Sequence, residues 1–240
     1  GKPFYGGTYF PPIAMQNRAS WMEVLQGVKN AFENNHEKIV EQATQLSNHL
    51  VQANIKMLET ENDGTAQFEA NKEELELMAN RILLSADTQW GGFGAAPKFP
   101  QTFALQMLLR SYHVSHNQAS LYQATLSLDK MIQGGIYDQI EGGFSRYSVD
   151  SEWFCPHFEK MLYDNVQLIK TYSLAYSKTN FDLYKEVISD TIQFLNEQLR
   201  GENGLYYSSI DADSEGEEGK YYTWDFKELK TLIPYKQNQE

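Results

Sequence analysis

Apolar residues recur at helical spacing along most of the chain. Between residues 18 and 60 they form one stripe, made of Trp21, Val24, Leu25, Val28, Phe32, Ile39, Ala43, Leu46, Leu50 and Met57. Residues three or four positions apart share one face of a helix, and the step from Phe32 to Ile39 is a heptad that keeps the stripe on that face. The pattern therefore predicts one long helix, or two nearly collinear helices.

The same spacing predicts further helices downstream. Asn71 and Glu74 form a capping-box pattern at the start of a helix that ends near Ala86. Apolar stripes predict helices at about 102–113, 118–132 and 181–199, and a short last helix from about residue 225. Another helix is predicted to begin at Pro156, since proline suits the first turn, and its body is apolar from Met161 onwards.

Three loops between these helices are long and rich in glycine and aromatic residues: residues 88–101, 134–153 and 201–224. Two contain Gly-Gly-Phe, starting at Gly91 and Gly142, and the third contains Gly204-Leu205-Tyr206. A repeat of about fifty residues with two helices per unit indicates an array of helical hairpins, whose long loops all lie at one end. The chain has too few hairpins to close a ring. We therefore expect a mainly α fold, a partial (α/α)6 toroid of helical hairpins with short β-hairpins in the loops at one end.

Composition narrows the class of partner. The net charge of −12 argues against nucleic acid and against anionic membrane surfaces, and it leaves neutral or cationic small molecules open. An acidic, solubilising surface explains the same charge without any partner. No apolar run approaches the roughly 18 residues of a membrane span. Cys155 is the single cysteine, so the chain can form neither an intrachain disulfide nor a cysteine-based zinc site, and we expect a cytoplasmic protein.

Four long motifs resemble one known family. They are GKPFYGGTYFPP (1–12), GGFGAAPKFPQ (91–101), GGIYDQIEGGFSRYSVDSEWFCPHFEKMLYDNVQL (134–168) and DADSEGEEGKYYTW (211–224). In this order they resemble the spermatogenesis-associated, thioredoxin-domain protein family. The resemblance implies a thioredoxin-like domain followed by an (α/α)6 toroid similar to the N-acylglucosamine 2-epimerase and six-hairpin glycosidase superfamily. Cys155 departs from the motif, where relatives more often carry an aliphatic residue.

The resemblance also implies a division of the chain. Residues 1–17 would be the C-terminal remnant of the thioredoxin-like domain, and residues 18–240 the N-terminal half of the toroid. The aromatic residues 1–12 predict a strand or hairpin remnant, or an arm that packs on the helices. We expect both ends to have been cut from a longer protein. Because half a ring exposes apolar helix faces, the fragment is also expected to dimerise.

His157 is the first candidate catalytic residue. In the first turn of the helix predicted from Pro156, the helix dipole favours a neutral imidazole, which suits a general base. Glu159 is its candidate acid partner, or a stabiliser of the helix N-terminus. Lys160 and Asp164 are spaced to pair with each other or to bind substrate. The alternative is a capping and salt-bridge cluster without chemistry. The resemblance adds that epimerases of the superfamily use pairs of histidines, of which only one is evident here.

Asp211 and Asp213 are the second pair of candidate catalytic residues, as catalytic carboxylates or as acceptors for sugar hydroxyls. They begin an acidic run whose later members, Glu215, Glu217 and Glu218, are interpreted as a solvated turn. Alternating carboxylates suggest calcium, but with Asp211 as the first position the twelfth position of an EF-hand loop is Tyr222. We therefore expect no metal, and no motif predicts another cofactor.

Aromatic and cationic residues of the loops are candidates for substrate binding: Trp90, Phe93, Lys98, Arg146, Tyr147 and Trp153. Sugar rings stack on aromatic faces, and Arg146 beside Tyr147 can bind a carboxylate or a phosphate. The alternative is that the aromatic side chains pack the loops against the helix ends.

Two hypotheses for function follow. The first is a catalytic toroid that acts on a carbohydrate or similar polyhydroxylated substrate. It would use epimerase or isomerase chemistry at His157, or glycosidase-like hydrolysis by carboxylates such as Glu159 and Asp211. The second is a non-catalytic module that binds a sugar or a protein and is attached to a thioredoxin-like redox domain.

Overall fold

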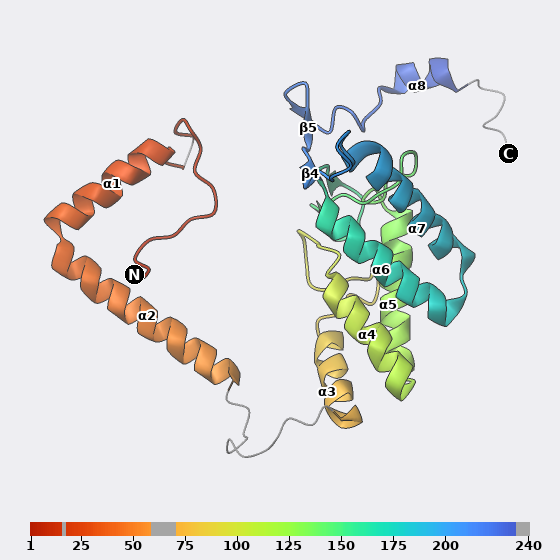
Figure 1. Cartoon of the computed structure of the whole chain (residues 1–240), viewed down its shortest axis with the longest axis horizontal. Helices are drawn as coiled ribbons and strands as arrows, with labels where there is room; N and C mark the ends of the chain where they lie inside the picture. Colours follow the sequence, from red (N-terminus) through yellow and green to blue (C-terminus); the bar gives the residue numbers. More distant parts are fainter. Residues whose placement is uncertain (16–17, 59–70, 234–240) are drawn as a thin grey trace. The chain divides into compact units, whose positions relative to one another are not determined.

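The computed structural model describes residues 1–15, 18–58 and 71–233, and its elements are labelled as in Figure 1. It divides into two compact units, Gly1–Glu69 (unit 1) and Ala70–Glu240 (unit 2). The domain boundary expected at residue 17 was inferred from the family resemblance. The division into compact units does not test it, so it stays a prediction. Helices dominate both units, and short strands occur in the loops of unit 2, in agreement with the fold class predicted from the sequence.

Unit 1 contains two helices, α1 (Trp21–Asn34) and α2 (His36–Leu58). The hydroxyl of Ser20 accepts a hydrogen bond from the Glu23 N–H, and the Glu23 carboxylate accepts one from the Ser20 N–H, which caps α1. Asn35 leaves the helical conformation, and α2 continues at an angle to α1 (Figure 1). The nearly collinear arrangement predicted from the apolar stripe is therefore wrong, because the polar residues around Asn35 permit a bend that periodicity does not reveal.

An extended arm, residues 1–12, precedes α1 and forms no strand. The ring of Phe10 lies 5.2 Å from that of Trp21, and the ring of Phe4 lies 6.4 Å from that of Phe32. Both helical partners belong to the apolar stripe of α1. The arm thus packs on the helices, which is one of the two arrangements that the sequence left open.

Unit 2 is built from helical hairpins. Its helices are α3 (Lys72–Leu83), α4 (Thr102–Ser115), α5 (Gln118–Gln133), α6 (Leu162–Thr179), α7 (Asp182–Phe194), the π-helical turn η1 (Leu195–Leu199) and α8 (Phe226–Leu232). Two-residue links join α4 to α5 and α6 to α7. The inward faces of α3 to α7 form the main core, in which Leu105, Leu128 and Tyr172 are fully buried, and Phe194, Leu195 and Leu199 form a second, smaller cluster. The helices predicted at 102–113, 118–132 and 181–199 are confirmed.

The long connections of unit 2 lie at one end, because the links within the hairpins are short (Figure 1). They carry six short strands that pair antiparallel, β1 (Tyr147–Ser148) with β2 (Pro156–His157), β3 (Lys160–Met161) with β4 (Ser209–Ile210), and β5 (Asp213–Ser214) with β6 (Glu217–Glu218). We call this the loop end. The prediction that the loops gather at one end of the helices is confirmed.

The helix predicted from Pro156 begins later, at Leu162. Pro156 pairs with Ser148 and Lys160 pairs with Ile210, so both positions belong to strands instead. The prediction was wrong because these strand pairings, the second of them with the distant third loop, outweigh the local preference of proline for a first helical turn. His157 consequently lies outside any helix, and the argument from the helix dipole does not apply to it.

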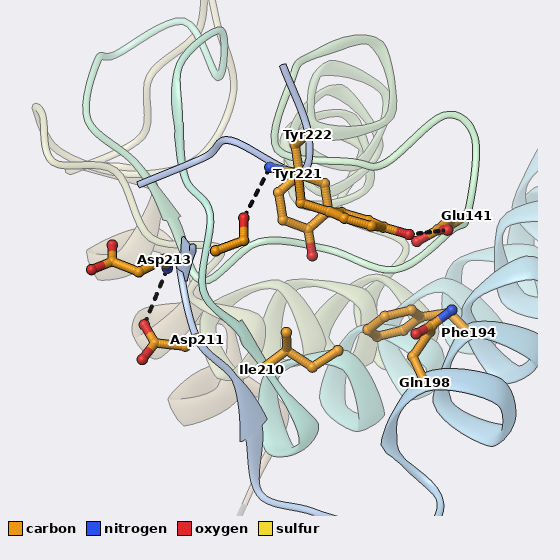
Figure 2. A pocket seen from close by; sticks show the side chains of 9 residues that line it. Glu141, Phe194, Gln198, Ile210, Asp211, Asp213, Tyr221 and Tyr222 are labelled. Carbon is orange, nitrogen blue, oxygen red and sulfur yellow. Dashed lines mark hydrogen bonds between the residues drawn. The ribbon is translucent and has the colours of Figure 1, made fainter. Parts of the chain in front are cut away.

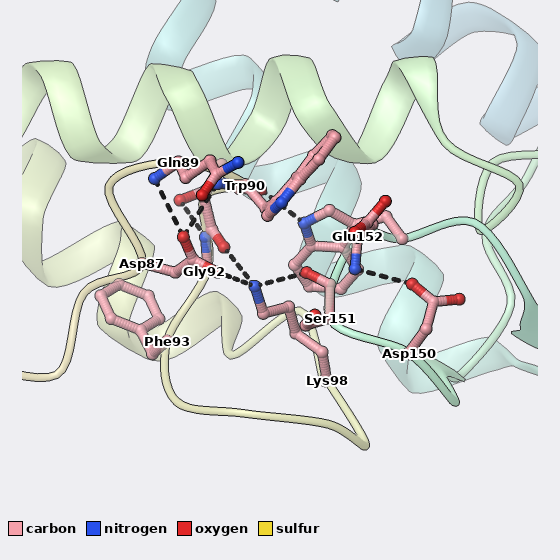
Figure 3. A network of polar contacts seen from close by, with 12 residues as sticks. Asp87, Gln89, Trp90, Gly92, Phe93, Lys98, Asp150, Ser151 and Glu152 are labelled. Atoms are coloured by element: carbon pink, nitrogen blue, oxygen red, sulfur yellow. Dashed lines mark hydrogen bonds and ion pairs between the residues drawn. The ribbon is translucent and has the colours of Figure 1, made fainter.

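Two loops repeat one arrangement around a buried lysine. The N–H of Asp87 donates to the carbonyl of Gly92, and the N–H of Asp138 donates to that of Gly143, both over 3.0 Å. Lys98 binds the first loop through Asp87 at 2.6 Å and the carbonyl of Gly91 at 2.9 Å, and it binds the second loop through the carbonyl of Ser151 at 2.8 Å (Figure 3). Lys160 binds the second loop through Asp138 at 2.7 Å and the carbonyl of Gly142 at 3.1 Å. The repeat seen in the sequence is therefore also a repeat of structure.

Candidate functional site

His157 lies on β2 at the loop end. Tyr147 is directly opposite it on β1, and the two rings stack with centroids 4.8 Å apart and planes inclined by 17°. Nδ1 of His157 is 2.8 Å from Oε1 of Glu218, whereas Nε2 is 3.9 Å from Oε2 of Glu159, too far for a hydrogen bond. A carboxylate only accepts, so the contact with Glu218 places the ring hydrogen on Nδ1. In the neutral imidazole Nε2 is then the proton acceptor, and it has no hydrogen-bond partner among the described residues.

Arg146 binds the second carboxylate of this cluster. Its Nη1 donates to Oε2 of Glu159 at 3.0 Å, and its backbone N–H donates to the Glu159 carbonyl at 2.8 Å. Asp164 lies in the first turn of α6, and its Oδ2 is buried without a hydrogen-bond partner among the described residues, as is Nε of Arg146. The pairing of Lys160 with Asp164 that their spacing allowed is not formed, because Lys160 binds Asp138.

Asp164 makes stability depend on pH. Burial raises its pKa to about 6, against the opposing effect of the Arg146 guanidinium and with a further rise from the Glu159 carboxylate. The unfolded chain releases this proton near pH ~4, whereas the folded protein keeps it until about pH 6. The free energy of unfolding therefore falls as the pH rises through that window, by at most about 3 kcal/mol.

We expect Asp164→Asn to remove this loss. Urea unfolding between about pH 4 and pH 7 should show the variant gaining stability relative to the wild type as the pH rises. The difference between the two proteins isolates Asp164 from every other titrating group. A difference that does not change with pH would mean that Asp164 ionises normally.

A pocket of about 220 Å³ lies at the same end, between the third loop and the end of α7 (Figure 2). Asp211 and Asp213 line one side of it, and Glu141 lies on the other side, where it accepts a hydrogen bond of 2.7 Å from the hydroxyl of Tyr221. Asp213 pairs with Glu218 across the β5–β6 hairpin. The same hairpin therefore carries a wall of the pocket and the partner of His157.

The structure thus brings some of the sequence-predicted residues together and separates others. His157 and Glu159 form one cluster with Arg146, Tyr147 and Asp164. Asp211 and Asp213 instead line the neighbouring pocket, whose lining does not include His157. Neither aspartate makes a hydrogen bond or an ion pair with His157 among the described residues, where its carboxylate neighbours are Glu218 and Glu159.

Four of the candidate substrate-binding residues are enclosed by protein. Phe93, Lys98, Trp153 and Lys160 are at most 3% exposed. Trp153 donates from its indole to the backbone carbonyl of Trp90 at 2.8 Å, and the two lysines hold the loops. A substrate cannot contact these side chains in this structure, so we assign the four to the scaffold. Trp90 is half-buried, with the ammonium of Lys130 5.1 Å from its ring.

Glu218, Glu141 and Tyr221 were not predicted as site residues. Glu218 lies in the acidic run that was interpreted as a solvated turn, and its partner His157 is 61 positions away. Glu141 and Tyr221 are separated by 80 positions. The only signal available in the sequence was the position of Glu141 immediately before the second Gly-Gly-Phe, where the first Gly-Gly-Phe is preceded by Trp90.

Over residues 1–15, 18–58 and 71–233, no group of three or more histidine, cysteine, aspartate or glutamate side chains could hold a metal ion. None of the helices in the described part of the chain combines the length and the apolar character needed to cross a membrane.

Comparison with solved structures shows the fold. The chain is similar to cellobiose 2-epimerase from Spirochaeta thermophila, with a TM-score of 0.53 and 18% identity over 58% of this chain and 39% of that chain. A sugar epimerase from a ruminal bacterium aligns with a TM-score of 0.51 and 15% identity, over 60% of this chain and 44% of that chain. At such low identity the likeness establishes the α/α toroid fold alone.

Sequence comparison shows the ancestry. A family model of thioredoxin-like proteins, described as "Protein of unknown function, DUF255", matches residues 1–51. Human spermatogenesis-associated protein 20 is 34% identical over 245 residues, which is 97% of this chain and 30% of that protein. The mouse protein of the same name is 34% identical over 246 residues, again 97% of this chain and 30% of its own length. This chain, which spans about 30% of the length of these relatives, belongs to the family of spermatogenesis-associated, thioredoxin-domain proteins.

Proposed function

We propose that the loop end of unit 2 moves a proton on a carbohydrate or similar polyhydroxylated substrate, as an epimerase or isomerase does, with His157 as the base. The observation that carries this proposal is the contact of 2.8 Å between Nδ1 of His157 and Glu218, which leaves Nε2 free to accept a proton. The side chain of His157 is 27% exposed, so a substrate can reach it.

The surroundings of His157 suit this role. The stacked ring of Tyr147 limits rotation of the imidazole. The ring of Phe99 lies 4.8 Å from that of Tyr147 and extends the aromatic surface. Sugar rings pack well on such surfaces because their C–H groups contact the aromatic face. When the imidazole takes a proton, the carboxylates of Glu218 and Glu159 stabilise its positive charge.

Proton transfer is supported better than glycosidase-like hydrolysis. A glycosidase needs two carboxyl groups facing each other across the scissile bond. Glu159 accepts a hydrogen bond from Arg146 at 3.0 Å, so this carboxylate is already engaged by a neighbouring side chain. Asp211 lies at the neighbouring pocket instead. The solved structures with the same fold are named as sugar epimerases, which agrees with the proposal.

The test is hydrogen exchange in heavy water. The protein in its natural full length is incubated with glucose, mannose, N-acetylglucosamine and N-acetylmannosamine, and NMR follows loss of the signal from the proton next to the carbonyl carbon. One base is enough to remove this proton and to return a deuteron. We expect exchange with at least one sugar. Absence of exchange with every sugar would favour the second hypothesis, a module that only binds.

A further inference from the structure

Lys160 shows how the loop end holds an ammonium group. Its Nζ is 2.7 Å from the carboxylate of Asp138 and lies 4.5 Å from the ring centroid of Phe194 and 4.9 Å from that of Tyr222. Aromatic faces attract cations through their quadrupole, and the carboxylate supplies the opposite charge. The side chain of this lysine is 1% exposed, so the rings and the carboxylate replace its water.

Lys98 is held in the same way in the preceding repeat. Its Nζ is 2.6 Å from Asp87 and 5.4 Å from the ring of Trp153, and its side chain is fully buried (Figure 3). The loop end therefore builds the same combination twice, an aromatic ring and a carboxylate around a primary ammonium. In both cases the ammonium comes from the chain itself.

A third combination of this kind lies open to solvent. Phe194 and Tyr222, the rings that contact Lys160, also line the pocket of Figure 2. A second pocket of about 280 Å³ shares Glu141, Tyr221 and Tyr222 with it and adds Asp138, Ile140 and Trp224. We call the two together the tyrosine cleft. Tyr221 is 59% exposed and Trp224 48% exposed, so their rings are available to a ligand.

The charges of the tyrosine cleft are unbalanced. Glu141 lines both of its pockets, Asp211 and Asp213 line the first and Asp138 lines the second, whereas no lysine or arginine among the described residues lines either one. Lys160 lies behind the wall, but its charge is balanced by Asp138. Lys220, next to Tyr221, pairs with Glu215. Phe194 and Tyr222 already contact the Lys160 ammonium, whereas the rings of Tyr221 and Trp224 contact no lysine or arginine among the described residues and lie beside Glu141.

We infer that the tyrosine cleft binds an organic ammonium group, with the amine near Glu141 and against the rings of Tyr221 and Trp224. The ligand class is an amino sugar, a polyhydroxylated molecule with a free amine. The sugar part of this inference rests on the proposed function, whereas the ammonium part rests on the cleft alone. A neutral sugar would leave the carboxylates without a counter-charge, and N-acylation would remove the charge that the cleft selects.

The experiment compares three sugars that differ at one carbon. Dissociation constants of D-glucosamine, N-acetyl-D-glucosamine and D-glucose are measured by ligand-detected NMR on the full-length protein at about pH 6, where an amine is protonated. We expect glucosamine to bind at least about tenfold more tightly than the other two, as a charge-assisted hydrogen bond implies. Added salt should weaken glucosamine binding and leave glucose binding unchanged.

Variants locate the site. Glu141→Gln should lower glucosamine affinity about tenfold without changing the affinity for glucose. Trp224→Leu, at a half-exposed position, should weaken glucosamine binding as well and guards against a folding defect in the first variant. Glu217→Gln removes a charge from the β5–β6 hairpin at a position outside the cleft, and this control should have no effect. Equal binding of the three sugars, no binding of glucosamine, or an unaltered Glu141→Gln variant would overturn the inference.

This outcome is independent of the exchange test. If neutral sugars exchange their proton and glucosamine shows no preference, only the ammonium site is overturned. If glucosamine binds in the cleft and no sugar exchanges, the cleft stands and proton transfer by His157 is refuted.

Discussion

Replacing Asp138 with alanine should lower the free energy of unfolding of unit 2 by about 3–5 kcal/mol, because it leaves the buried Lys160 ammonium without its counter-charge. Asp138 pairs with Lys160, and its second oxygen accepts hydrogen bonds from the N–H groups of Ile140 and Glu141. Burial acts to raise the pKa of Asp138, but the hydrogen bond and positive charge of Lys160, together with the two backbone N–H groups, outweigh it, and the pKa lies below its usual value. Without Asp138, the Lys160 ammonium keeps one hydrogen-bond acceptor among the described residues, the carbonyl of Gly142. Urea unfolding followed by circular dichroism measures the loss.

Two controls separate stranded charge from loss of a side chain. Adding Lys160→Met to Asp138→Ala should recover part of the stability, since no buried charge then lacks a partner. Glu215→Ala breaks the exposed ion pair with Lys220 and should cost less than about 1 kcal/mol. If Asp138→Ala costs no more than Glu215→Ala, the buried pair does not hold the second loop.

Helix positions could be predicted from the sequence because they depend on spacing alone. The stripes that predicted helices at 102–113 and 118–132 correspond to α4 and α5, whose faces bury Leu105 and Leu128. Each such helix needs only a continuous apolar face to find its place in the core. The repeat of glycine-rich loops then placed the loops at one end, since hairpins of equal length return the chain to the same side.

The segment from Pro156 to Met161 could not be predicted in the same way. Its conformation is decided by pairing with Tyr147–Ser148 and with Ser209–Ile210, and the second partner lies far along the chain. Local preference favoured a helix, and the pairings with distant residues prevailed. The candidate base His157 was therefore identified for a reason that does not hold, its supposed place in a first helical turn, although the structure gives it a carboxylate partner by another route.

The two lysines show what residue chemistry alone conceals. Lysine is rarely buried unless it is paired, so Lys98 and Lys160 were interpreted as surface cations available to a substrate. The sign that they are scaffold lay in the repeat. Asp87 and Asp138 each precede the first glycine of a Gly-Gly pair by four positions, and a lysine follows each pair. A recurring aspartate with a recurring lysine indicates a structural unit that the fold needs twice.

Replacing Glu218 with glutamine should slow the exchange of sugar protons by at least about tenfold, and His157→Ala should slow it by about 10²–10⁴-fold. Glutamine has nearly the same shape, but its amide can donate to Nδ1 of His157. The ring hydrogen then moves to Nε2, and the base is lost while the fold is kept. Glu218 is 54% exposed at its side chain, so the change costs little stability. The ¹⁵N shifts of His157 report the tautomer directly, and Glu217→Gln on the same strand serves as the control. If Glu218→Gln leaves the tautomer and the exchange rate unchanged while His157→Ala abolishes exchange, His157 remains the base, and Glu218 is not the residue that positions it.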